Sequence, residues 1–84
     1  MPMPRLKRLS AREILKIFHG FGFEVVAIRG SHAKLRRELK GGSPQILTLP
    51  LHRDLAPGTV HAIFRQALRY IPEPDLRPRF FGPD

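Results

Sequence analysis

Apolar residues near the start of the chain recur with the spacing of an α-helix. These residues are Ala11, Ile14, Leu15 and Phe18. Ser10 and Glu13 match the S-x-x-E capping box, in which each side chain satisfies a backbone amide of the other residue. The pattern predicts a helix over residues 11–19. Gly20 is the expected residue just past its end, since glycine adopts positive φ without steric cost.

A second helical stripe lies in the last third of the chain. Its apolar positions are Val60, Ile63, Phe64, Ala67, Leu68 and Ile71. They predict a helix over residues 60–70 with Thr59 as its N-cap. The segment from Pro72 onward is rich in proline, which cannot continue a helix. Residues 72–84 are therefore expected to be an extended or mobile tail, whose Phe80 and Phe81 could still pack onto the domain or a partner.

Three segments between the helices alternate with the period of a β-strand. They cover residues 23–29, 32–39 and 45–49, and glycine-rich turns separate them. In the middle segment Ala33, Leu35 and Arg37 share one face, and His32, Lys34, Arg36 and Glu38 share the other. Such short connections predict an antiparallel meander.

The order of the expected elements is α-β-β-β-α, which predicts an α+β fold with a three-stranded antiparallel sheet. Two helices would cover one face of the sheet and leave the other to solvent or a ligand. A chain of 84 residues forms one domain. We expect this domain over residues 1–71, with a short basic arm at residues 1–9, followed by the proline-rich tail 72–84.

The composition adds a strong positive charge. Fifteen Lys and Arg face seven Asp and Glu, giving a net charge of +8. This charge favours nucleic acid as the partner, although solubility or an acidic protein would also account for it. The chain has no cysteine, hence no disulfide or zinc–thiolate site. It has no apolar run near the roughly 20 residues of a membrane span and no secretory signal, so we expect a soluble cytoplasmic protein without membrane contact.

His32 is the main candidate for chemistry, because it begins a basic strand. RNA carries its own nucleophile, the 2′-hydroxyl, and a histidine can take or give a proton near neutral pH. Lys34 and Arg36 on the same face would stabilise developing negative charge. Ser31 would orient the ring or donate to a phosphate. The alternative is an exposed histidine with no chemical role.

Further candidates surround this position. His52 would be a second acid or base, or else a loop residue bonded to backbone. Thr59 would bind phosphate at a helix start, or else only cap the helix. The densest basic run, which would contact RNA or form a solvated face, is Lys34, Arg36, Arg37 and Lys40. No histidine pair has metal-ligand spacing, so neither a metal nor another cofactor is expected.

Four pieces of sequence together resemble the HicA family of toxin-antitoxin systems. They are GFGFEVV at 20–26, Gly30-Ser31-His32, Leu49-Pro50-Leu51-His52, and Gly58-Thr59 before VHAIFRQA. The resemblance covers about residues 10–70 and excludes the tail. It implies a fold like a double-stranded-RNA-binding domain, and a toxin endoribonuclease (mRNA interferase) that cuts mRNA. It also implies a HicB-type antitoxin that covers His32.

The sequence and the resemblance together predict metal-independent cleavage with His32 as the catalytic residue. Two alternatives from other functional classes stay open. A non-catalytic double-stranded-RNA-binding module would need the basic residues but no imidazole. A protein-interaction domain would use Phe80 and Phe81 and would have no affinity for RNA.

Overall fold

The computed structural model describes residues 4–82. In chain order the elements are β1 (Arg5–Leu6), α1 (Ala11–Gly20), β2 (Glu24–Arg29), β3 (His32–Arg37), β4 (Gln45–Pro50), α2 (Pro57–Ala67), α3 (Glu73–Phe80) and β5 (Phe81–Gly82). The first three residues of the expected arm and the last two of the expected tail lie outside the described part. No helix within residues 4–82 has the length and apolar character needed to cross a membrane.

The three central strands form the predicted antiparallel meander in the order β2-β3-β4. Strand β3 lies in the middle. Its Ala33 and Leu35 are 1% exposed. On the adjoining strand β4, Leu47 is 1% exposed and Leu49 is fully buried. The side chains between them in the sequence are exposed. The α+β fold class and the predicted face of the middle strand are therefore confirmed.

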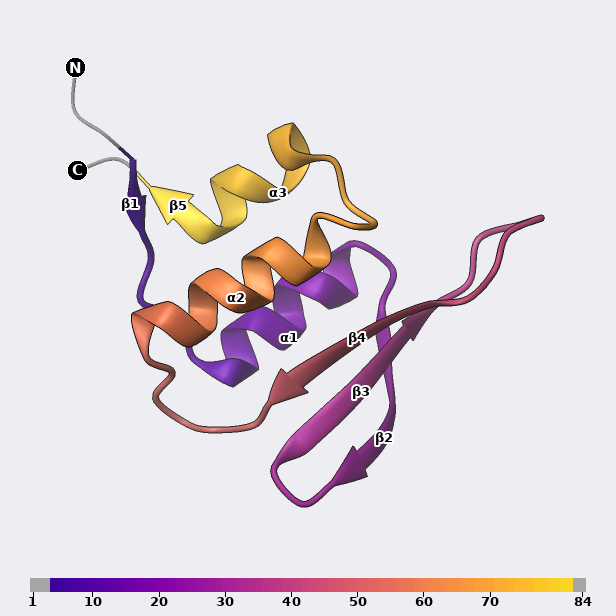
Figure 1. Cartoon of the computed structure of the whole chain (residues 1–84), viewed down its shortest axis with the longest axis horizontal. Coiled ribbons are helices and arrows are strands. Elements are labelled where there is room, and N and C mark those ends of the chain that lie inside the picture. The colour runs from indigo at the N-terminus through magenta and orange to yellow at the C-terminus, as the bar shows by residue number, and fades with distance from the viewer. Residues whose placement is uncertain (1–3, 83–84) are drawn as a thin grey trace.

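Helices α1 and α2 pack side by side against this apolar face (Figure 1). Their buried side chains are Ala11, Ile14, Ile17 and Phe18 from α1, and Val60, Ile63, Phe64 and Ala67 from α2. Residues at these spacings form one stripe along a helix, so each helix can bury its apolar side and expose its polar side. The predicted pair of helices on one face of the sheet is confirmed, and the opposite face carries no covering element among the described residues.

The start of α1 follows the prediction, but its end does not. Ser10 and Glu13 form the capping box. The positive φ belongs to Gly22 (+94°) and not to Gly20, which is the last helical residue. The amides of Gly22 and Phe23 donate to the carbonyls of His19 and Phe18, 2.9 and 3.0 Å away. This is the bond pair of a Schellman motif, so the chain uses its second glycine as the helix stop.

Helix α2 begins three residues before the predicted start. Ala56 is its N-cap, and Pro57 takes the first helical position, where proline's missing amide is not needed. Thr59 therefore lies inside the first turn, and the prediction that it caps the helix was wrong.

The expectation of an extended tail was also wrong. Residues 73–80 form α3, and β5 pairs antiparallel with β1, with Arg5 opposite Gly82 and Leu6 opposite Phe81. Leu76 and Phe80 are fully buried. The Phe80 ring lies 5.9 Å from that of Phe18 and 5.5 Å from that of Phe64, so α3 closes the core that α1 and α2 begin.

Candidate functional site

The site begins with a two-residue turn between β2 and β3. Arg29 and His32 are paired across the strands, so only Gly30 and Ser31 lie between them. Gly30 has φ +56°, a backbone conformation that only glycines adopt within residues 4–82. Glycine at the first central position suits a type II′ hairpin turn, whose twist matches that of the strands. The Gly-Ser-His sequence thus fixes the imidazole at the first position of the central strand.

The sheet register determines the neighbours of His32. Residues directly opposite each other on adjacent strands project to the same side. His32 therefore lies between Arg29 of β2 and Pro50 of β4, and Lys34 lies between Ala27 and Thr48 in the next row of that face. Both side chains are exposed. Imidazole and ammonium consequently share an open surface.

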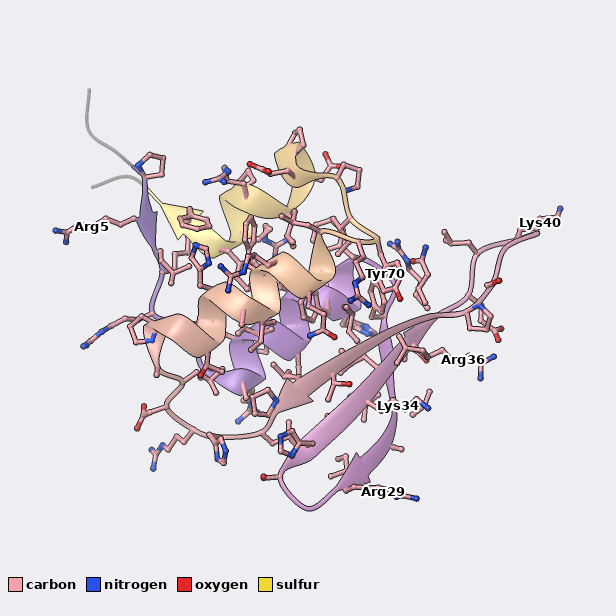
Figure 2. The ribbon with its side chains drawn as sticks, viewed as in Figure 1. Arg5, Arg29, Lys34, Arg36, Lys40 and Tyr70 are labelled. Carbon is pink, nitrogen blue, oxygen red and sulfur yellow. The ribbon has the colours of Figure 1, made fainter. Side chains whose placement is uncertain are left out.

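The cations on this surface project away from the helices. Figure 2 shows Arg29, Lys34 and Arg36 along the sheet and Lys40 at the tip of the long β3–β4 loop. Among residues 4–82, neither Arg29 nor Lys34 has a carboxylate partner. Arg36 forms an exposed ion pair with Glu38, so a phosphate would have to compete with that carboxylate for it.

Arg29 belongs to this candidate surface, although the sequence reasoning did not identify it. It is paired with His32 across the turn. A two-residue Gly-Ser turn places the residues on either side of it opposite each other. Recognising that turn in the sequence would have identified Arg29.

Arg37 lies apart from the other predicted RNA-contacting residues. It is on the helix side of the sheet and is partly buried. Its Nε donates to Gln45 Oε1 at 2.8 Å, and its Nη1 and Nη2 donate to the carbonyls of Phe21 and Tyr70 at 2.9 Å. Its guanidinium carbon lies 4.6 Å from the centre of the Phe23 ring. The structure therefore places Arg37 in packing between the sheet and the ends of α1 and α2.

Backbone pairing brings the segment of His52 to the hairpin turn. The amide of Leu51 donates to the carbonyl of Ser31, which extends the β3–β4 pairing beyond Pro50. His52 is the next residue and is exposed, as is Ser31. The two predicted histidines thus lie at the same end of the sheet. Thr59 lies in the first turn of α2, where its amide donates to the carbonyl of Ala56 at 2.9 Å.

The remaining histidines lie elsewhere. His19 is exposed in the last turn of α1. The ring of His61 lies 6.3 Å from that of Phe64 and 6.1 Å from that of Phe81, so it packs on the helix layer. Across residues 4–82, no three His, Asp or Glu side chains gather in a way that could hold a metal ion.

Comparison with known proteins adds one finding to this geometry. Residues 11–68, well over half of the 84-residue chain, match the family model of the HicA toxin of bacterial toxin-antitoxin systems. No curated protein and no solved structure shows a significant match. The matched segment runs from the first residue of α1 past the end of α2, and so contains the whole three-stranded sheet and the Gly30-Ser31-His32 turn. The chain belongs to the HicA toxin family of bacterial toxin-antitoxin systems.

Proposed function

We propose that the chain is a metal-independent endoribonuclease that cleaves mRNA in the cytoplasm until a HicB-type antitoxin binds it. The observation that supports this most directly is the exposed row of Arg29 and His32, with Lys34 in the next row of the same face. Membership of a toxin family agrees with an activity that needs a partner to restrain it.

In the proposed reaction His32 is the general base. It takes the proton of a ribose 2′-hydroxyl, and the resulting oxygen forms a bond to the adjacent phosphorus. The bond from phosphorus to the 5′-oxygen then breaks, and that oxygen receives a proton. The products are a 2′,3′-cyclic phosphate and a free 5′-hydroxyl.

Arg29 and Lys34 hold the phosphate in this scheme. Negative charge on its non-bridging oxygens increases in the transition state, and cations fixed beside those oxygens stabilise it. Arg36 and Lys40 extend the contact along the bound strand, and Ser31 donates to a phosphate at the turn. Arg37 and the amide of Thr59 have no part, since both are engaged in the contacts described above.

His52 is the proposed acid that protonates the leaving 5′-oxygen. Its exposed position next to the Ser31–Leu51 hydrogen bond puts it at the end of the sheet where His32 begins β3. His52→Ala should remove one limb from the dependence of the cleavage rate on pH. An unchanged profile would exclude His52 from the chemistry.

The test of the function is cleavage of RNA by purified protein in the presence of EDTA. We expect His32→Ala to reduce the rate by about 10²–10⁴ while RNA still binds, because this is the usual contribution of general base catalysis. Mass spectrometry of the fragments should find cyclic phosphate ends with the wild-type protein.

His19→Ala is the matched control, since His19 is exposed but lies at the end of α1. It should cleave like the wild type. Intact RNA that is bound by the wild-type protein would contradict the nuclease proposal and support a non-catalytic RNA-binding module.

A further inference from the structure

Strand β2 has an unused edge. It pairs only with β3, and no strand of the described chain pairs with its other side. All six of its residues are exposed. A free edge presents a row of backbone donors and acceptors that can pair with a strand from another molecule.

The apolar side chains of this edge are uncovered although they belong to the helix side of the sheet. Val25 and Ile28 are opposite Leu35 and Ala33, which are 1% exposed, yet they are themselves 43% and 60% exposed. The register shift between Val25 and Ala27 leaves Val26 as the extra, bulged residue, 54% exposed. Three of the four large apolar side chains exposed in residues 4–82 are therefore on this one short strand.

A groove between α1 and β2 continues this apolar surface. It has a volume of about 560 Å³, and its floor includes Leu15, Phe23, Val25 and Leu35. An added strand beside β2 would therefore find both a backbone to pair with and an apolar groove for alternate side chains.

The positive charge around the groove favours an acidic partner. Arg12 and Lys16 of α1 line it, together with His19, and neither Arg12 nor Lys16 has an ion pair among the described residues. Glu24 is the one carboxylate in the lining. A second copy of this chain, at net charge +8, would bring repulsion to this rim, whereas an acidic strand would neutralise it.

We propose that the free edge of β2 is the docking site for a strand of the antitoxin that carries both apolar side chains and carboxylates on its helix-facing side. The strand pairs with β2, its apolar side chains cover Val25 and Ile28, and the carboxylates on the same side meet Arg12 and Lys16. Adjacent strands lie about 4.8 Å apart, so the docked strand lies about 10 Å from β3. Segments that follow it can then cover His32. The docking site rests on family membership and not on the nuclease activity.

The test measures binding of the cognate antitoxin to the full chain carrying His32→Ala, so that its outcome does not depend on cleavage. Val25→Glu combined with Ile28→Glu should weaken binding at least a hundredfold, measured by calorimetry. Leu39→Glu is the control, because Leu39 is an equally exposed apolar residue (47%) outside β2. It should change the affinity less than threefold. Circular dichroism and thermal unfolding establish that the variants are folded.

Two further measurements separate strand pairing from other modes of contact. Amides of residues 24–29 should become protected from hydrogen exchange when the antitoxin binds. Reversing the rim with Arg12→Glu and Lys16→Glu should weaken binding at least tenfold, more at low salt than at high salt. Unchanged affinity of the β2 variant, absence of added protection in β2, or absence of a complex with the parent chain would each overturn the proposal. So would a dimer of the free chain that the β2 substitutions dissociate, since the edge would then bind a second copy.

Discussion

Single basic residues in the segment 34–40 have different tasks, and the sheet register separates them. Lys34 projects from the open face, whereas Arg37 projects to the helix side and donates hydrogen bonds to oxygens of the protein. The sequence analysis predicted RNA contact for all of them, because charge density along a chain does not show which face each residue takes. Alternation did predict the face of Arg37, but not its hydrogen bonds to three protein oxygens on that side.

We expect Arg37→Leu to lower the free energy of unfolding by about 2–3 kcal/mol, since it leaves the carbonyls of Phe21 and Tyr70 without their donor and removes the stacking on Phe23. Urea denaturation measures this loss. Arg36→Leu should cost less than about 0.5 kcal/mol, because its ion pair with Glu38 is exposed. Equal losses for the two variants would contradict the distinct packing role of Arg37.

Arg29 and Lys34 allow a test of phosphate binding. Each phosphate contact to a single strand contributes about 0.7 to the slope of log K against log salt. We expect Arg29→Ala and Lys34→Ala each to reduce that slope by about 0.7 for RNA bound to the His32→Ala protein, as measured by fluorescence anisotropy. Arg65→Ala, exposed on α2, should leave the slope unchanged. A slope unchanged in all three would remove both residues from the proposed interface.

At the scale of elements, the sequence predicted those whose pattern is local and missed those that depend on tertiary contacts. The helical stripe of α1 and the alternation of β3 were sufficient for prediction. The bulge at Val26 was not visible, since four successive apolar residues at 25–28 fit either face. Helix α3 was missed because its prolines were read as breakers. Pro74 lies in the first turn, where proline is tolerated, and packing of Leu76 and Phe80 stabilises the rest.

The capping box of α1 makes stability depend on pH. Hydrogen bonds from the backbone and then the side chain of Ser10, with a smaller contribution from the charge of Lys16, lower the pKa of Glu13 below its ordinary 4.5. A carboxylate with a lowered pKa stabilises the fold above its ordinary pKa and loses that effect as the pH falls through the lowered value. Glu13→Gln should therefore unfold with a flatter pH dependence below about pH 5. Thermal unfolding in a pH series measures this, and parallel curves for the two proteins would contradict it.

At the scale of the whole molecule, segments far apart in the sequence pack together to complete the core. The α-β-β-β-α order predicted the two-layer arrangement, yet the position of α3 across α1 and α2 and the pairing of β1 with β5 were not foreseen. Contacts between residues some 75 positions apart leave no local signature. The sequence-based division at residue 71 remains a prediction, although Phe80 packs into the same core as Phe18.

We expect Phe80→Ala to lower the free energy of unfolding by about 3–5 kcal/mol, the usual loss for a fully buried phenylalanine. That is a large part of the total for a chain of 84 residues, about 4–12 kcal/mol. Chemical denaturation, followed by far-ultraviolet circular dichroism, measures this loss. Arg79→Ala, an exposed neighbour, serves as the control. A loss below about 1 kcal/mol for Phe80→Ala would mean that the C-terminal helix is not integral to the core.

The short turn at Gly30 and Ser31 links the position of the His32 ring to the burial of the core. Side chains of a strand alternate with period two, so a one-residue shift of β3 against its neighbours would turn the imidazole inward and bring Ala33 and Leu35 out to water. Such a shift would remove the buried apolar face and the proposed catalytic face in a single step. If His32 has the proposed role, variants of intermediate activity should therefore arise from substitutions around the ring and not from slippage of this strand.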